Sequence, residues 1–368
     1  MKRRQLLVVG ATLLAGCSSG ESGTDETETE QTTTTATTAT PTRTTTATET
    51  TTETTTTEET TTETETEQTT TTEKPNEDIV AARKRLEEAF EVYTSVASSS
   101  DGEVSILDVT FTSGAFSRSK LVSRLEDARD ALDDAAQSAT DDEKKTIERL
   151  RDVALFFEHA SYIERNLVRA YYHYGKVLKW TYAGDYAKAK STFERMTEDR
   201  KKAADRRWTV DKETDVASTD ATDLLTREEY DGTVKRLQNG VGDVKKLESF
   251  AEKLVGGFEK FADGNRKYGN GAYGDAASWF YRAGNDLEDL NDEISDAELV
   301  DALSSTVEKL TCLIEAVVEA AEHMEEAAES RENENTDAAR RAERDARDAA
   351  ESCDEVSKTL AIAEDMDK

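Results

Sequence analysis

The pattern of apolar and polar positions divides the chain into three regions. Residues 6–15 (LLVVGATLLA) are apolar except for Thr12, residues 18–75 are mostly Thr and Glu, and from residue 77 onwards apolar residues recur three and four positions apart. That spacing places them on one face of an α-helix. No proline follows Pro75, so the strongest helix breaker is missing from the third region. The pattern predicts an all-α domain over residues 76–368.

The periodic segments predict an array of antiparallel helical hairpins. We expect helices over 77–97, 118–137, 141–182, 185–206, 226–270, 273–292, 296–330 and 336–365. Asp141 is expected to cap the third of these helices, which could break near Gly175. The stretch 104–111 (VSILDVTF) reads as an extended segment that covers an edge of the core, and 208–222 reads as a polar loop.

An internal duplication is predicted, because two long-then-short helix pairs align without gaps at an offset of 87 residues, giving repeat units 141–206 and 228–292. The shared pattern Gly-X-Tyr-X-X-Ala-X-X-X-Phe resembles the turn and second helix of a tetratricopeptide repeat. The offset far exceeds the roughly 34 residues of a tandem array, so the resemblance implies similar hairpins without a peptide-binding superhelix. The matched residues are Gly184, Tyr186, Ala189 and Phe193 in one unit, and Gly271, Tyr273, Ala276 and Phe280 in the other.

The last two segments predict a coiled-coil hairpin over residues 296–365. Paired antiparallel, their two apolar seams place the fold point near Asn333. Cys312 and Cys353 then lie at matching heights, but Cys312 is on the opposite side of its helix from the seam, which favours two separate packed thiols over the alternative of a disulfide. The seams are Leu303, Val307, Leu310, Ile314, Val317, Ala321, Met324 and Ala342, Ala346, Ala349, Cys353, Val356, Leu360, Ala363.

The N-terminus combines a basic start, Lys2-Arg3-Arg4, with an apolar run too short for the roughly 20 residues that span a bilayer. The following Leu14-Ala15-Gly16-Cys17 resembles the lipobox of bacterial and archaeal lipoproteins. The resemblance implies a signal peptide over 1–16 and a lipid on Cys17, which would anchor the chain on the extracytoplasmic face of the cell membrane. An ordinary secretory signal is the alternative. Arg3-Arg4 also resembles a twin-arginine signal, so both export routes stay open.

Composition extends this interpretation to residues 17–75. A Thr/Glu tract buries too little apolar surface to fold, so we expect a disordered stalk, either O-glycosylated or an unmodified acidic linker. The formal net charge is −32, and residues 1–75 hold 13 acidic and 5 basic side chains, which leaves −24 spread along the helical domain. That charge disfavours nucleic acid as a partner. With the lipobox and stalk, it resembles surface lipoproteins of halophilic archaea.

The sequence offers no reactive centre. The three histidines are not clustered, Glu-X-X-His is absent, and no phosphate loop, dinucleotide fingerprint or Gly-X-Ser-X-Gly elbow is present. We therefore predict no catalytic residue, metal or cofactor. The predicted function is a non-enzymatic surface lipoprotein that binds or scaffolds a protein or solute; the alternative is a solute-capture subunit of a membrane transporter. The candidate ligand or partner surface consists of Tyr174, Trp180, Tyr186, Tyr273, Trp279 and Phe280.

Overall fold

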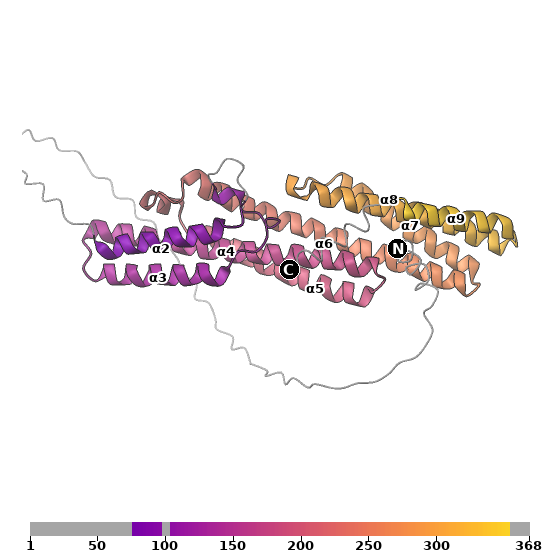
Figure 1. Cartoon of the computed structure of the whole chain (residues 1–368), viewed down its shortest axis with the longest axis horizontal. Coiled ribbons are helices and arrows are strands. Elements are labelled where there is room, and N and C mark those ends of the chain that lie inside the picture. The colour runs from indigo at the N-terminus through magenta and orange to yellow at the C-terminus, as the bar shows by residue number, and fades with distance from the viewer. Residues whose placement is uncertain (1–75, 98–103, 354–368) are drawn as a thin grey trace, which may run out of the picture. The chain divides into compact units, whose positions relative to one another are not determined.

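The computed structural model describes residues 76–97 and 104–353, and within these ranges the chain is helical, with no strand (Figure 1). The all-α prediction is confirmed. The α-helices are α2 (Glu77–Thr94), α3 (Arg118–Ala136), α4 (Asp141–Tyr182), α5 (Tyr186–Glu213), α6 (Arg227–Gly269), α7 (Tyr273–Ser295), α8 (Ser304–Glu332) and α9 (Thr336–Glu351). Short 3₁₀ segments are η1 (Ile106–Asp108), η2 (Val216–Ala221) and η3 (Asp301–Leu303).

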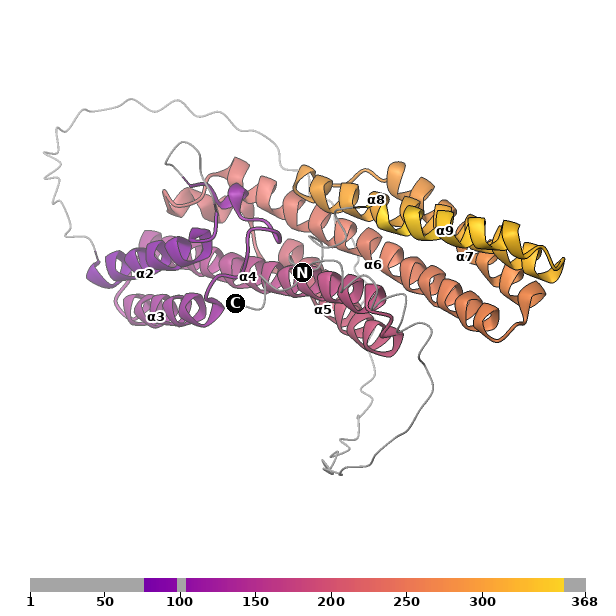
Figure 2. The same ribbon diagram turned by 45° about the vertical axis from the view of Figure 1, so that its right-hand side comes forward.

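Consecutive helices pack in pairs: α2 with α3, α4 with α5, α6 with α7, and α8 with α9 (Figures 1 and 2). The pairs are joined to one another through α3–α4, α4–α6, α5–α6 and α7–α8 contacts. Each of the helices α2 to α8 therefore buries an apolar stripe against more than one neighbour, whereas α9 packs on α8.

Threonine caps fix where the two longest helices begin. The hydroxyl of Thr140 accepts from the backbone N–H of Glu143, whose carboxylate accepts from the Thr140 N–H in return. Thr226 and Glu229 repeat this arrangement at the start of α6. Such caps contribute about 1 kcal/mol each. The expectation that Asp141 is the cap was wrong by one residue, because the capping oxygen belongs to Thr140.

The α4–α5 and α6–α7 turns have similar backbone conformations. Gly184 has φ +74° and Gly271 has φ +78°, a left-handed conformation that a Cβ would strain. α5 begins at Tyr186 and α7 begins at Tyr273, which are 87 positions apart as the aligned repeat requires. The two hairpins thus correspond in the end of the first helix, the turn and the start of the second helix, whereas α5 is five residues longer than α7.

Several boundaries differ from the predictions. α5 continues through Trp208 to Glu213, where the expected loop should have been, because buried Val210 extends its apolar face. α8 begins at Ser304, eight residues later than expected, after η3. α4 runs through Gly175 without a break.

The stretch 104–111, expected to be extended, contains η1 at its centre, and the flanking Ser105 and Val109 have extended backbone. Ser105 and Asp108 make a reciprocal capping box that closes this 3₁₀ turn. Ile106, Val109 and Phe111 are buried, so its apolar side chains do cover the core as expected.

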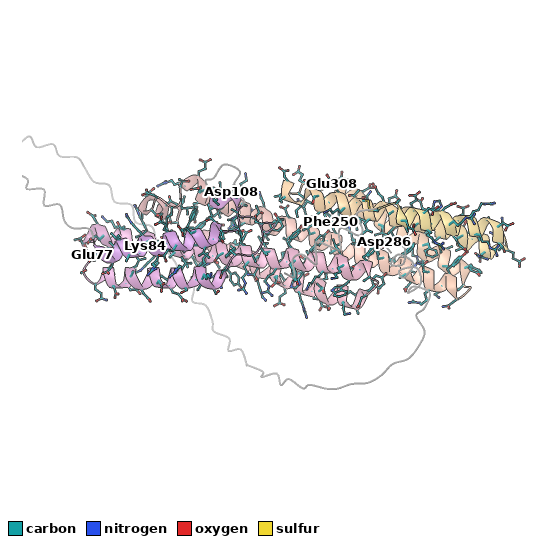
Figure 3. All side chains as sticks on the ribbon, viewed as in Figure 1. Glu77, Lys84, Asp108, Phe250, Asp286 and Glu308 are labelled. Atoms are coloured by element: carbon teal, nitrogen blue, oxygen red, sulfur yellow. A yellow bond between two sulfur atoms is a disulfide. The ribbon has the colours of Figure 1, made fainter. Side chains whose placement is uncertain are left out.

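Aromatic contacts hold the central helices together. Phe156 of α4 stacks on Tyr230 of α6 with ring centroids 4.4 Å apart, and Phe157 contacts Phe90 of α2 at 6.0 Å. Phe250 of α6 is buried, whereas Glu77 is exposed at the start of α2 (Figure 3). Burial of each such ring contributes roughly 1.5–3 kcal/mol.

The α8–α9 pair turns at Asn333–Asn335, which confirms the predicted fold point. Small residues form the buried face of α9, as the seam requires, namely Ala339, Ala342, Ala346 and Ala349. α8 carries a second buried row, Leu313, Ala316 and Ala320, since it packs against α7 as well as α9. The predicted seam positions Val356, Leu360 and Ala363 lie outside the described residues.

The expectation of two separate thiols was wrong, because Cys312 and Cys353 form a disulfide with Cα atoms 5.8 Å apart. Cys353 was expected to lie on the last helix. That helix ends at Glu351, and Cys353 lies beyond its C-cap residue, Ser352. The side chain of Cys353 is therefore free of the angular constraint that separated the two faces.

Candidate functional site

A cavity of about 140 Å³ lies between α7 and α8. Its wall residues recur three or four positions apart on each helix, so each set occupies one helical face. α7 contributes Phe280, Tyr281, Gly284, Asn285 and Glu288, and α8 contributes Val318, Glu322 and Glu325.

Small residues explain why a cavity forms at this point. A Cβ placed on Gly284 would lie 3.8 Å from the Cβ of Ala321. The two helices therefore approach closely, and no side chain from position 284 fills the space beside the contact. Larger residues on either side of Gly284 then become the walls.

The cavity carries an uncompensated negative charge. Glu288, Glu322 and Glu325 form no ion pair within the described residues. Burial raises the pKa of Glu325, and repulsion from Glu329 and Glu322 raises it further. Residues 310–330 contain neither lysine nor arginine, so α8 supplies no local counter-charge. An external cation would relieve this repulsion.

Aromatic rings complete the cavity. Phe280 is fully buried and packs with Phe261 at 5.5 Å between ring centroids. Tyr281 is 56% exposed, which is unusual for a large apolar ring in this domain. Ring faces attract ammonium and guanidinium groups, by about 0.5–2 kcal/mol. An organic cation could pair with the carboxylates and contact the accessible ring face.

The described residues contain no group of three His, Cys, Asp or Glu side chains close enough to hold a metal ion.

The structure does not bring the six predicted aromatic residues together. Phe280 lines the cavity, whereas the other five lie elsewhere in the described part of the chain. Tyr174 is buried in the core beside Tyr171, with ring centroids 6.4 Å apart. Trp180 is partly buried beneath the Lys188 ammonium, which lies 4.8 Å from a ring centroid.

The remaining predicted aromatics act in helix packing. The Tyr186 hydroxyl donates to the backbone carbonyl of Phe258 (3.0 Å), and burial raises the pKa of Tyr186 to about 12. Tyr273 packs edge-on against Tyr268 at 5.3 Å. Trp279 is partly buried, with the Arg282 guanidinium 5.9 Å from its ring.

The three cavity glutamates were not predicted as a site, and Tyr281 is not among the six aromatic residues predicted as a surface. Acidic residues are so common in this chain that no carboxylate group stood out. The sequence did contain one indication: Glu322 and Glu325 have no lysine, arginine or histidine at i±3 or i±4.

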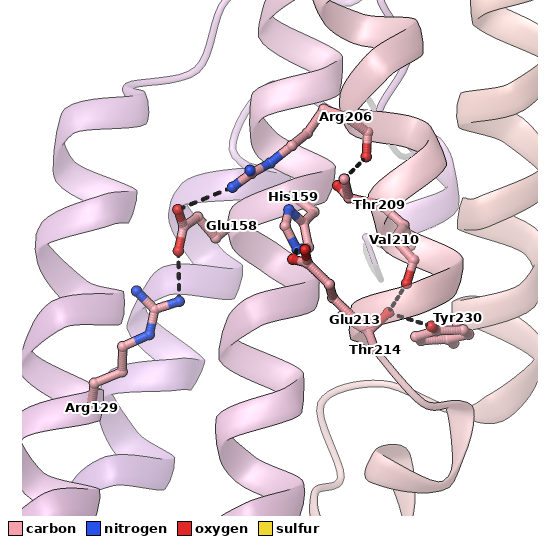
Figure 4. A network of polar contacts seen from close by, with 9 residues as sticks. All are labelled: Arg129, Glu158, His159, Arg206, Thr209, Val210, Glu213, Thr214 and Tyr230. Carbon is pink, nitrogen blue, oxygen red and sulfur yellow. Dashed lines mark hydrogen bonds and ion pairs between the residues drawn. The ribbon is translucent and has the colours of Figure 1, made fainter. Parts of the chain in front are cut away.

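The three histidines lie apart. His159 is buried, and its Nε2 lies 2.9 Å from the Glu213 carboxylate (Figure 4). His173 contacts buried Asp199 at 3.4 Å. Burial lowers the pKa of both imidazoles. These contacts join α4 to α5 and are structural.

Comparison with protein-family models, curated proteins and solved structures found no match to this chain. Among the described residues, no helix combines the length and apolarity needed to cross a membrane. Cys17 and the expected stalk lie outside the described residues.

Proposed function

We propose that this chain is a non-enzymatic, lipid-anchored surface protein whose helical domain binds a protein partner. In this proposal, the α7–α8 cavity admits a basic side chain of the partner. The observation that supports it is the convergence of three unpaired glutamates with Phe280 and exposed Tyr281. A lysine or arginine head group would neutralise the carboxylates and contact a ring face at once.

The cavity volume favours a side chain over a whole solute. Small-molecule sites enclose roughly 300–1,000 Å³, and this cavity has about 140 Å³. It would bury one head group, with the rest of the ligand outside. A protein partner therefore fits better than the solute expected for a transporter's capture subunit.

The disulfide supports a location outside the cytoplasm. Disulfides persist mainly in oxidising compartments, and the Cys312–Cys353 bond joins α8 to the residues after α9. This agrees with the proposed export signal and with lipid attachment at Cys17. The Thr/Glu region would then hold the domain away from the membrane.

Calorimetric titration of the full-length protein with short peptides tests the binding proposal. Peptides with a single lysine or arginine among glycines should bind, and peptides with glutamate there should not. Glu322→Gln should weaken binding about tenfold, since it removes a carboxylate from the cavity. Glu326→Gln is the matched control, because it makes the same charge change at an exposed residue of α8 outside the cavity. Equal affinities for both variants would contradict the proposed site.

A further inference from the structure

One part of this acidic chain carries a positive charge. Residues 165–213 contain 13 basic and 7 acidic side chains, although the whole chain has a net charge of −32. They form the second half of α4 and all of α5. The expectation of evenly spread acidity does not hold here.

Arginines from three helices gather around Tyr162 of α4. The guanidinium carbon of Arg118, at the start of α3, lies 5.3 Å from the ring centroid of Tyr162. That of Arg206, on α5, lies 5.5 Å from the same centroid. Arg165 follows on the next turn of α4 and is close enough to act on Arg118 electrostatically. We call Arg118, Tyr162, Arg165 and Arg206 the arginine cluster.

The arginine cluster holds more positive charge than the neighbouring carboxylates balance. Glu158 accepts from Arg129 at 2.6 Å and is 3.5 Å from Arg206, so one carboxylate is shared by two guanidinium groups (Figure 4). Arg118 and Arg165 have no ion pair within the described ranges. Burial lowers the pKa of Arg118, and the positive charge of Arg165 lowers it further.

Unused hydrogen-bond donors accompany this charge. The Nε atoms of Arg118 and Arg206 are buried and have no hydrogen-bond partner. A buried donor without a partner costs about 1–3 kcal/mol. The first turn of α3 also lacks hydrogen-bond acceptors, because Ser117 provides no side-chain cap and the turn contains no acidic residue. The start of that helix therefore contributes a further partial positive charge.

We propose that the arginine cluster binds an oxyanion of the phosphate or sulfate type, held between the start of α3 and the facing sides of α4 and α5. Guanidinium N–H groups form paired hydrogen bonds with two oxygens of such an anion. The ligand would balance the positive charge that Glu158 leaves uncompensated. This site has the opposite charge from the α7–α8 cavity and does not depend on it.

Titration calorimetry of the full-length protein tests this site with sodium phosphate, sodium sulfate and glycerol phosphate, at an ionic strength held constant with chloride. We expect saturable binding that Arg118→Gln weakens at least about tenfold. Arg341→Gln, an equal charge change at an exposed residue of α9, should leave the affinity unchanged. If glycerol phosphate binds about tenfold more tightly than phosphate, the ligand is a phosphate ester. If the two bind equally, the ligand is the free ion. Either result supports the site.

A second measurement needs no variant of the cluster. In ¹H–¹⁵N spectra of the wild-type protein, the Nε–H resonances of Arg118 and Arg206 should shift as phosphate is added. The proposal is overturned by an absence of saturable binding, by equal weakening in both arginine variants, or by Nε–H resonances that stay in place while phosphate binds.

Discussion

Cys312 of α8 and Cys353, two residues after the end of α9, have Cα atoms 5.8 Å apart and are joined by a disulfide. The bond fastens the end of the last described helix to the middle of the hairpin, at a sequence separation of 41 residues. α9 otherwise presents mainly alanines to α8. Because alanine buries little apolar area, the covalent link has a large share in holding α9 in place.

Cys353→Ser should lower the free energy of unfolding by about 4 kcal/mol, the loop-closure value for a 41-residue span. Urea unfolding of oxidised wild type and the variant measures the difference. Cys17→Ser, which changes a cysteine outside the helical domain, should leave the unfolding midpoint unchanged. Finding that Cys312 and Cys353 both react as free thiols in unreduced, denatured protein would refute the bond.

Adjacent glycines on α6 should respond in opposite directions to alanine. A Cβ on Gly257 would lie 2.6 Å from side-chain atoms of Leu287, whereas Gly256 has no atom within 4 Å of that position. Gly257→Ala should destabilise the protein by about 1–3 kcal/mol through overpacking. Gly256→Ala should stabilise it by up to about 1 kcal/mol through helix propensity. Thermal unfolding measures both, and equal shifts would contradict the α6–α7 packing.

Stability should fall as pH drops below about 6.5 because of His159. Burial lowers its pKa in the folded state, while the unfolded chain titrates near 6.5. Below that pH the unfolded state binds more protons, so the free energy of unfolding decreases. Urea unfolding across a pH series should show a shallower decrease for His159→Gln, which keeps a donor for Glu213. An unchanged slope in that variant would contradict the role given to His159.

Lipid attachment at Cys17 predicts the behaviour of the whole protein in cells. The wild-type chain should fractionate with membranes and enter the detergent phase on phase separation, because two lipid chains give stable anchoring. Cys17→Ser should lose the lipid and shift to the soluble fraction. Mass spectrometry of the N-terminal peptide checks the modification directly. A Cys17→Ser protein that stays with the membrane would point to another means of attachment.

The sequence predicted the fold better than it predicted the candidate site. Apolar spacing and the absence of proline located the helices, and the Gly184 and Gly271 turns were visible in the repeat. Helix ends were harder, since buried Val210 extends α5 through a segment whose local composition is polar. The cavity could not be predicted, because it depends on how closely α7 and α8 approach at Gly284, a tertiary relationship without a local pattern.

The aromatic residues show the same division. Tyr174 and Phe280 were predicted as part of a ligand or partner surface, and both are buried, but sequence alone could not say which neighbours would bury them. Helical spacing places residues on faces of one helix. It does not say which face meets another helix, so packing rings and exposed rings look alike.

The most direct test of binding through the α7–α8 cavity is photo-crosslinking with the native partner. A photoreactive phenylalanine analogue replaces Tyr281 at the cavity in the full-length protein, which is then incubated with membranes from the source cells. A second protein carries the analogue in place of Trp208, an exposed ring on α5. We predict that the analogue at position 281 labels one protein, and that the same analogue at position 208 does not label that protein. Adding Glu322→Gln and Glu325→Gln to the position-281 protein should abolish the labelling. Labelling from position 281 that persists in the double glutamine variant would contradict binding through the cavity.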